Sequence, residues 1–539
     1  MRKSKIFYGG PIITMNDNIP SVEAVGIEED KIVAVGSFTD IKEKLPEAEL
    51  IDLNNHSLLP GFHDCHCHAL AYVYFPRFLN LRNTKSYSDF LHNLSEIAKK
   101  KKSKEWIIGL SYDEQNFNDE KRLPDKWELD KICPNNPVFI FRNDGHIGIA
   151  NSMALDFAEI NENSVSPEGG EFRRNKKGEL NGEITERATR IFRQFAYERL
   201  KDENIEDLAT EAFQNLAERG ITTVHSILNY DITGKSTYQR ANEVPLLKSL
   251  QHIILQNWYS FIFTGRPKNL EGLRKEPPFN GAMKDTKFKA QAIKLYLDGT
   301  LGGCTAWMHD PYTDEPEKKG MCVYNNLEII YFQMKEAHKL GYQIGVHAIG
   351  DKANRVLVDL YKRLLTEFPK KDHRHRIEHA SLLTSDVIKD MKELGIIASV
   401  QPPFITGDRK LAVSRLGAER CKYTYPIKSL VDAGVLCASG SDSPVEDPDV
   451  ILGLDALVNR DGFVPEQCIS IKDALKTYTI NGAYSAFEED VKGSIEVGKL
   501  ADLVILDKNP LEVPNNEIKD LRVLETIIRG KTVFKKERS

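Results

Sequence analysis

LLPGFHDCHCH (residues 58–68) is an apolar run that ends in two histidines, His66 and His68. Because side chains alternate along a β-strand, residues two apart point to the same side. Two imidazoles that face one axis are well placed to bind a transition metal. Taken alone, such a pair is more often two exposed histidines in a turn, so the interpretation depends on the rest of the chain.

Seven further apolar, strand-like runs follow along the chain: 221–227, 252–262, 290–299, 342–350, 375–380, 395–403 and 434–443. Intervening segments, notably 326–341, 353–368 and 385–395, have the periodicity of amphipathic helices. Alternating strands and helices with right-handed crossovers form a parallel sheet, and eight strands close it into a barrel. The sequence therefore predicts an α/β fold of the (β/α)8 TIM type.

Both ends of the chain lack this alternation of strands and helices. Residues 4–60 are short alternating strands broken by turns, and similar strands return at 493–507 and 521–534. Chain ends commonly lie close together at the surface of a domain. We expect 1–60 plus 491–539 to form one small β domain, a β-sandwich.

The remaining residues, 61–490, should form the barrel together with an insertion. About 135 residues separate the first strand from the helix that leads into the second, which is too long for a structureless loop. We therefore expect an inserted subdomain at 70–205. Insertions on the catalytic face of a barrel usually shape the substrate pocket.

Composition excludes several classes of protein. The 539 residues are 41% hydrophobic and 28% charged with a net charge of −6, as in a globular protein with a large core and no affinity for nucleic acid. The first residues lack the apolar segment of a signal peptide, and no window approaches 18 consecutive apolar residues, so we expect no membrane partner and a cytoplasmic location. The eight cysteines are scattered, unlike a disulfide framework. The sequence leaves open whether the protein forms a homodimer.

Four polar residues interrupt later apolar runs at or near their ends: Lys294, His347, His379 and Asp442. Barrel active sites are assembled from side chains at the carboxyl ends of different strands, so these residues should converge with His66. Each also has a plainer interpretation, a core histidine or, for Asp442, a helix cap. Five such coincidences at strand ends favour a metal site.

Lys294 is the most informative of these residues. It lies between Ile293 and Leu295 in an expected buried strand, where an ammonium group loses much hydration free energy. A depressed pKa would favour the neutral amine, which can react with carbon dioxide to give a carbamate that bridges two metal ions. The alternative is a lysine at a strand edge whose amine reaches water.

Other motifs suggest competing or additional sites. His375, Glu378 and His379 spell HxxEH, the inverted zincin pattern, but that chemistry needs a helix and the flanking helices leave room only for a strand. Cys65 and Cys67 could form a thiolate site, although no second cysteine pair follows at zinc-ribbon spacing. We expect three further residues to contact substrate, with ordinary packing as the alternative for each: His146, Trp307 and His225.

Together these blocks resemble the amidohydrolase superfamily, and specifically its YtcJ-like branch, which includes N-substituted formamide deformylases. LPGFHDCHCH is similar to the superfamily's PGFxDxHxH, and IKLYLDGTLGGCTAWMHDPY to a block peculiar to this branch. FRNDGHIGIANSMAL, GVHAIGD, RIEHA, SVQPPF and SGSDSPV match further blocks in the expected order, and GSIEVGKLADLVILD resembles the closing β motif. One departure is His63, where the family usually has an aliphatic residue.

The resemblance implies a binuclear centre with two divalent metal ions, zinc being favoured by the histidine ligands. His66 and His68 would bind the first ion and His347 and His379 the second, with carboxylated Lys294 bridging them and Asp442 completing the site. It implies hydrolysis of an amide-like C–N bond in a small molecule, an N-formyl or N-acyl amide or a cyclic amide, through a metal-activated hydroxide with Asp442 as proton carrier. The alternatives are a non-catalytic regulatory relative and a heterocycle deaminase on the same scaffold.

Overall fold

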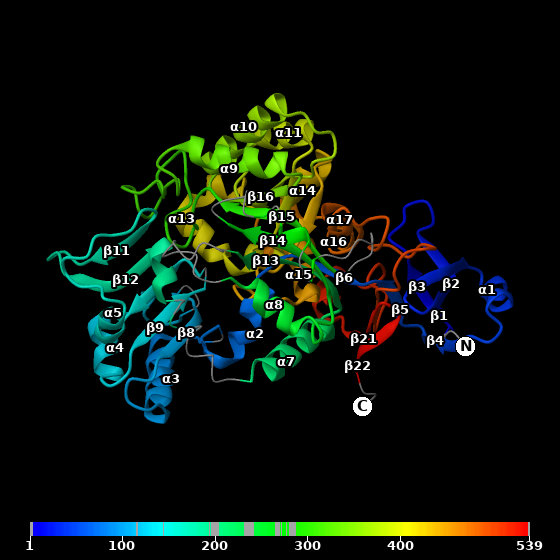
Figure 1. Ribbon diagram of the computed structural model, residues 1–539, viewed down its shortest axis with the longest axis horizontal. Coiled ribbons are helices and arrows are strands. Elements are labelled where there is room, and N and C mark those ends of the chain that lie inside the picture. Colours follow the sequence, from blue (N-terminus) through cyan, green and yellow to red (C-terminus); the bar gives the residue numbers. More distant parts are fainter. Residues whose placement is uncertain are drawn as a thin grey trace.

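The computed structural model describes residues 4–82, 84–114, 117–143, 145–192, 195, 204–230, 242–264, 270, 272–275, 278–279 and 287–536. Its centre is a sheet of eight parallel strands, each paired with the next in chain order (Figure 1). The strands are β6 (Phe62–Cys67), β13 (Ile221–Asn229), β14 (Asn257–Phe263), β15 (Phe288–Tyr296), β16 (Gln343–Ala348), β17 (Arg376–His379), β18 (Ile397–Val400) and β19 (Cys437–Ser439). The predicted (β/α)8 barrel is confirmed.

Strands β6 and β19 close the barrel, and polar contacts from their carboxyl ends join them. The Asp442 N–H donates to the His66 carbonyl at 2.7 Å, and the His68 N–H donates to the Ser443 carbonyl at 2.7 Å. The buried Asp64 carboxylate accepts the Ser441 N–H at 2.9 Å. Closure of the barrel therefore also sets the distance between the histidine pair on β6 and Asp442 beyond β19.

Amphipathic helices cover the outside of the barrel. In α10 (Asp351–Glu367) the buried residues Leu357, Tyr361 and Leu364 recur three and four positions apart, which gives the helix one apolar face against the strands. Helix α11 (Ser385–Leu394) is followed by Gly395, whose φ of +68° provides a left-handed cap. The other helices of the barrel are α2 (Ala69–Tyr74), α7 (Ile205–Glu218), α8 (Val244–Leu250), α9 (Leu327–Lys339), α11 (Ser385–Leu394), α12 (Pro402–Gly407), α13 (Arg409–Cys421), α14 (Ile427–Asp432), α15 (Val450–Val458), α16 (Ile471–Thr477) and α17 (Ile480–Ser485).

Strands from both chain ends form a second sheet, which lies at the right in Figure 1. Its members are β1 (Ser4–Ile13), β2 (Ser21–Glu28), β3 (Lys31–Gly36), β4 (Glu49–Asp52), β5 (Ser57–Pro60), β20 (Leu503–Leu506), β21 (Val523–Ile528) and β22 (Lys531–Lys535), with helix α1 (Phe38–Lys44) after β3. The two ends meet where β5 pairs antiparallel with β20. The terminal β domain is thus present, while its exact boundaries stay a prediction.

The run 58–68 is divided between the two sheets. Residues 57–60 belong to β5 in the terminal sheet, and the barrel strand begins only at Phe62. Gly61 lies between them, and a Cβ atom there would come within 2.2 Å of the Thr222 side chain. The apolar run therefore spans two strands, and Gly61 is the point where the chain passes from one sheet to the other, because any side chain there would collide with Thr222.

A third sheet lies between β6 and β13 in the sequence and at the left in Figure 1. Its strands are β7 (Leu79–Asn80), β8 (Ile107–Tyr112), β9 (Val138–Arg142), β10 (Ile147–Ala150), β11 (Gly170–Arg174) and β12 (Leu180–Glu186), with helices α3 (Tyr87–Lys100), α4 (Lys126–Ile132) and α5 (Ser152–Phe157). Separate apolar clusters surround Phe139 and Phe90. An insertion with its own core follows the first barrel strand, as predicted.

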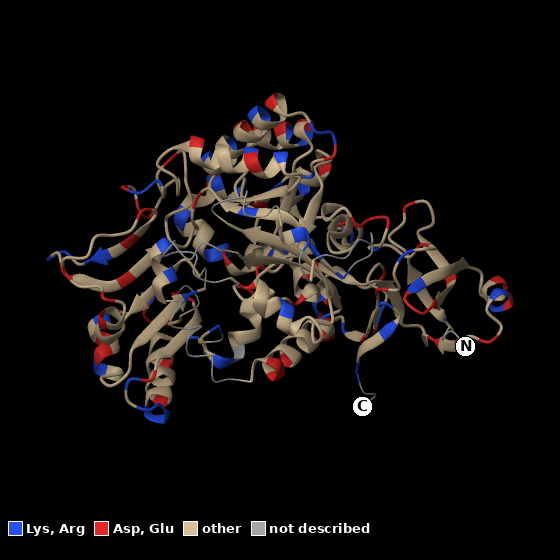
Figure 2. Ribbon diagram, in the orientation of Figure 1, with Lys and Arg blue, Asp and Glu red and all other residues tan. Residues whose placement is uncertain are grey.

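Acidic and basic residues are interspersed along the helices and loops (Figure 2). Among the described residues, no helix combines the length and the apolar character that crossing a membrane requires.

A buried polar group joins the terminal sheet to the barrel. Asp502, just before β20, accepts from the Asn257 side-chain amide at 2.8 Å and from the Arg529 N–H at 2.7 Å. Asn257 begins β14, and its side-chain oxygen Oδ1 accepts from Arg529 Nε at 2.9 Å. Both Asp502 oxygens are therefore acceptors for donors on two different elements.

We expect Asp502→Asn to lower the free energy of unfolding by about 1–3 kcal/mol, because an amide has only one acceptor oxygen and must point its NH2 group at a donor. Urea unfolding followed by circular dichroism measures the change. Asp507→Asn is the matched control, since the Asp507 carboxylate accepts a single N–H, from Arg522, and an amide oxygen can replace it. Equal effects of the two substitutions would contradict the proposed linkage.

Candidate metal centre

Three predicted ligands converge at the carboxyl ends of the barrel strands. Ligand atoms of His66, His379 and Asp442 all lie within 4.8 Å of one another, and the three residues are buried. His66 Nε2 and His68 Nε2 lie 3.5 and 3.3 Å from Asp442 Oδ1. The histidine pair on β6 thus faces the aspartate beyond β19.

The remaining two predicted ligands lie on neighbouring strands. Lys294 Nζ, on β15, is 3.4 Å from His66 Nε2. The His347 ring, on β16, has its centroid 4.4 Å from that of His379. All six predicted residues therefore border one polar centre, with His68 the most exposed of them.

The backbone is strained where two of these ligands leave their strands. His379 has a φ of +77° and Asp442 a φ of +58°, in a region that residues with a Cβ atom rarely adopt. Each such conformation costs of the order of 1–3 kcal/mol and persists only where the surrounding structure enforces it. For Asp442 the hydrogen bond to the His66 carbonyl is part of that enforcement.

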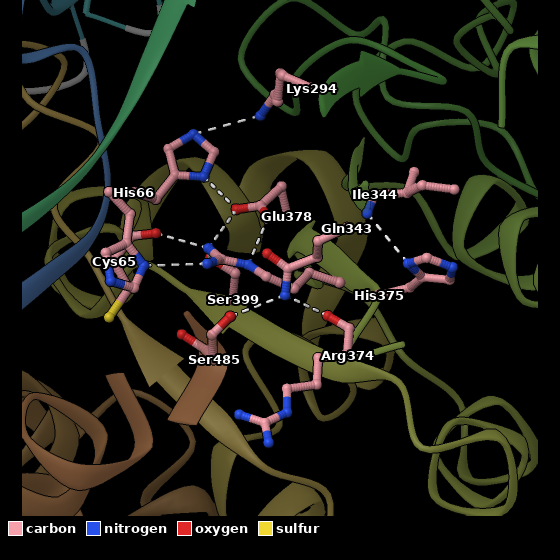
Figure 3. A network of polar contacts seen from close by, with 12 residues as sticks. Cys65, His66, Lys294, Gln343, Ile344, Arg374, His375, Glu378, Ser399 and Ser485 are labelled. Atoms are coloured by element: carbon pink, nitrogen blue, oxygen red, sulfur yellow. Dashed lines mark hydrogen bonds and ion pairs between the residues drawn. The ribbon is translucent and has the colours of Figure 1, made fainter. Parts of the chain in front are cut away.

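A buried ion pair orients His66 from behind (Figure 3). Glu378 Oε2 contacts His66 Nδ1, which leaves Nε2 as the ring nitrogen directed at Lys294 and Asp442. Arg376 Nε lies 2.8 Å from Glu378 Oε1. A carboxylate that holds the second nitrogen of a ligating histidine fixes its tautomer and raises its basicity.

Arg376 is itself fixed by neutral acceptors. Its Nη2 donates to the Cys65 carbonyl at 2.6 Å and to Ser399 Oγ at 2.7 Å. Burial alone would raise the pKa of Glu378, but Arg376 and His66 outweigh burial and hold that pKa well below its usual range. Glu378 is therefore a permanent anion behind His66.

His347 is held by the loop that follows β15. Its Nε2 lies 3.0 Å from the Gly299 carbonyl, an acceptor, so Nε2 carries the proton and Nδ1 keeps a lone pair. The adjacent Asp298 carboxylate accepts backbone N–H groups from Trp307, Ile349 and Gly350 at 2.8–3.0 Å. These bonds join the loops after β15 and β16 and fix where His347 stands.

The electrostatics favour cation binding by neutral imidazoles. Burial lowers the pKa of His66, His347 and His379, so their lone pairs stay available at neutral pH. Burial would raise the pKa of Asp442, but the neighbouring His66 and His68 lower it to about 2. Burial lowers the pKa of Lys294 to about 8, against the opposing effect of Glu378 and Asp442.

The residues present fit a divalent cation. Within the described ranges, His379 Nδ1 and Asp442 Oδ1 are buried with no hydrogen-bond partner, although His66 and His68 approach Asp442 Oδ1. Buried polar atoms without partners are costly, and several converging on one point are typical of ligands that share an ion. Imidazole and carboxylate donors suit zinc and neighbouring transition metals.

A cavity of about 580 Å³, measured out to its open mouth, leads to this centre. Its lining includes His347, His379 and Asp442 from the barrel and His146 from the insertion. Apolar walls come from Ile349, Phe404, Leu411 and Val445. The predicted substrate residue His146 therefore lies at the cavity.

The other two predicted substrate residues lie elsewhere. His225 is fully buried, and its Nδ1 accepts from Arg376 Nη1 at 3.2 Å. The Trp307 ring lies under Lys352 Nζ, 4.6 Å from its centroid, and does not line the cavity. Neither placement supports contact with substrate: His225 packs beside His63 in the barrel core, and only the backbone N–H of Trp307 is engaged near the centre, by Asp298.

The competing motifs do not form sites. His375 bonds with His338 at 2.8 Å and stacks on Tyr361, remote from His379, because residues 376–379 form a strand and not a helix. Burial raises the pKa of both the Cys65 and Cys67 thiols, which disfavours thiolate ligands.

Sequence reasoning missed the supporting residues Glu378, Arg376, Asp298 and Glu186. A signal existed for the first two: charged residues at alternate positions of RIEH point to the same side of a strand that had to be buried. No local signal marks Glu186, because its contacts are made with other segments of the chain.

Comparison with known proteins agrees with this geometry. The model of the amidohydrolase family matches residues 49–534. The protein named "Putative amidohydrolase YtcJ" of Bacillus subtilis (strain 168) is 29% identical over 98% of this chain and 99% of its own length. The N-substituted formamide deformylase of Arthrobacter pascens is 26% identical over 96% of this chain and 97% of its own.

A solved structure shows the same fold over nearly the whole chain. The crystal structure of an "uncharacterized metal-dependent hydrolase" from Pyrococcus horikoshii OT3 superposes with a TM-score of 0.73 at 28% identity, covering 95% of this chain and 99% of that one. The resemblance found in the sequence blocks is thereby confirmed over the full fold. The chain belongs to the amidohydrolase family.

Proposed function

We propose that this protein is a metal-dependent hydrolase that cleaves an amide-like C–N bond of a small molecule. The observation that carries the proposal is the convergence of His66, His379 and Asp442 within 4.8 Å at the base of a cavity. The name of the deformylase relative supports the C–N bond class. Esters share the same carbonyl chemistry and are the natural second substrates to test.

His66, His68, His347, His379 and Asp442 would hold the ions, with Lys294 between the two histidine pairs. A divalent ion held there lowers the pKa of water and polarises a carbonyl group. The chain's own residues exclude bulk water, since five of the six groups are buried. Glu378 and the Gly299 carbonyl fix which nitrogen of His66 and of His347 faces the centre.

Asp442 is the proton carrier in this proposal. Its low pKa keeps it ionised in the resting state, so Oδ1 can accept the proton that the attacking water loses. As the C–N bond breaks, the same proton passes to the leaving nitrogen, which departs as an amine. Water supplies a hydroxyl group to the new carboxylic acid, which then releases its remaining proton to solvent, and the aspartate returns to its initial state.

Lys294 is proposed to act as a carbamate. A buried ammonium beside metal ions would be repelled by them, whereas the neutral amine reacts with carbon dioxide, releases a proton and becomes an anion. The closeness of Nζ to His66 Nε2 and the lowered pKa of the lysine support this step. The carbamate would add two oxygen ligands between the histidine pairs.

The activity itself is tested with purified protein reloaded with Zn²⁺ or Mn²⁺ after chelation. We expect hydrolysis of at least one of N-benzylformamide, an N-acetyl amine and dihydrouracil, loss of turnover with dipicolinate, and recovery on adding metal. Release of ammonia from cytosine without amide hydrolysis would indicate a deaminase. Metal-loaded protein that turns over none of these compounds would contradict the proposal.

Replacing Lys294 with Ala should reduce the metal content to one ion or fewer per chain and remove most turnover, because the bridging anion is lost. Mass spectrometry of metals and steady-state rates measure both effects. Propionate or another short carboxylic acid should restore part of each. Lys289→Ala is the control on the same strand, since its amine pairs with Glu488 instead. Two ions and full activity in Lys294→Ala would reduce the lysine to a structural role.

Glu378→Gln should weaken metal affinity by about 10- to 100-fold. The neutral amide replaces the carboxylate that accepts from His66 Nδ1–H, so the imidazole becomes a less basic ligand. Competition with a fluorescent zinc chelator measures the affinity. Glu393→Gln, on the exposed end of α11, serves as the control. Unchanged affinity in Glu378→Gln would show that the carboxylate does not tune the ligand.

A further inference from the structure

The insertion supplies a histidine–carboxylate pair to the cavity. His146 immediately precedes β10 and lines the cavity beside His347, with the two ring centroids 5.6 Å apart. Its Nδ1 lies 2.7 Å from Glu186 Oε2, at the end of β12. The Glu186 N–H in turn donates to the His146 carbonyl at 2.6 Å. One side-chain contact and one backbone hydrogen bond therefore hold His146 and Glu186 next to each other.

Glu186 is held as firmly as the ligands of the centre. Only 5% of its side chain is exposed, and its φ of +51° is another strained conformation at a residue with a Cβ atom. Its second oxygen, Oε1, accepts from Thr305 Oγ1 at 2.5 Å. Thr305 belongs to the loop after β15, so the carboxylate joins the insertion to the barrel.

The same loop makes room for this carboxylate. A Cβ atom on Gly299 would come within 2.3 Å of Thr305 Oγ1 and 2.5 Å of Glu186 Oε1. The Gly299 carbonyl is also the acceptor for His347 Nε2. The missing side chain of Gly299 thus leaves room for the Glu186–Thr305 contact, and the backbone carbonyl of the same residue holds a proposed ligand.

We propose that His146 is a catalytic hydrogen-bond donor to the carbonyl oxygen of the substrate, and that Glu186 and Thr305 are its positioning residues. The inference rests on the proposed function. The Glu186 carboxylate accepts from Nδ1–H and stabilises the imidazolium form of His146, in which Nε2 also carries a proton and can donate. By the geometry of the ring, Nε2 then points away from Glu186, and the ring stands at the cavity wall next to His347.

The chemistry needs such a donor where charge develops. Attack of water on a carbonyl places negative charge on its oxygen, and a fixed donor in a site shielded from water stabilises that charge. No proton is transferred by His146: the proton of water passes to Asp442 and then to the leaving nitrogen, and His146 keeps its own. Removal of one such donor typically costs about 10²–10³-fold in kcat.

The test compares two substrates that differ in leaving group, N-benzylformamide and 4-nitrophenyl acetate, in metal-loaded protein. His146→Ala should lower kcat by about 10²–10³-fold for both, with KM changed less than about threefold, because the oxyanion forms in both reactions. His146→Gln, which keeps a donor, should lose less. Glu186→Gln and Thr305→Val should lower kcat by smaller factors without loss of metal.

His309→Ala is the control, because His309 is an exposed histidine on the loop after β15, which also carries Thr305. A readout independent of turnover is the affinity for benzyl methylphosphonate, a stable tetrahedral anion, measured by calorimetry; His146→Ala should weaken it at least tenfold.

Two results would overturn the inference. A loss confined to the amide would make His146 a proton donor to the leaving group, and equal rates and affinities in wild type and His146→Ala would leave it structural. If the metal-loaded wild type hydrolyses neither substrate, the proposed function fails and the inference fails with it. The first two results leave the proposed function intact.

Discussion

The ion pair between Glu378 and Arg376, inside the barrel, is the interaction on which the candidate centre depends. Two charges are taken out of water there, and the attraction between them offsets the desolvation only because each makes further bonds: the guanidinium to the Cys65 carbonyl and Ser399, the carboxylate to His66. Removing either partner would leave a buried charge alone. Burying the pair therefore costs desolvation free energy, and its position directly behind His66 suggests that it serves to orient this ligand.

Hydrogen bonds between distant segments likewise bring three parts of the chain to one cavity. Closure of the barrel between β6 and β19 sets Asp442 against the histidine pair. The loop after β15 holds His347 through Gly299 and reaches the insertion through Thr305 and Glu186. The strained residues Asp442 and Glu186 lie at these two junctions, where the surrounding contacts enforce their backbone.

How far the sequence predicts this arrangement depends on the range of the contacts. The barrel, its closing number of strands and the six polar residues at strand ends follow from local periodicity, because each strand carries its own apolar pattern and its own interruption. His225 and Trp307, predicted to contact substrate, lie away from the cavity lining, because a side chain at the end of a run can face either the cavity or the packed core. Glu186 was missed because its partners, His146 and Thr305, lie in other segments of the chain, whereas the alternating charges of RIEH were a local signal for Arg376 that was not used.

The central claim is that the residues around His66, His379 and Asp442 hold the metal ions, with Lys294 between the two histidine pairs. Anomalous diffraction at the zinc edge from crystals of metal-loaded protein tests it most directly. The account predicts a peak about 2.0–2.2 Å from a nitrogen of His66 and an oxygen of Asp442, with density for a carbamate extending from Lys294 Nζ. A fully loaded protein whose peak lies away from these residues would contradict it.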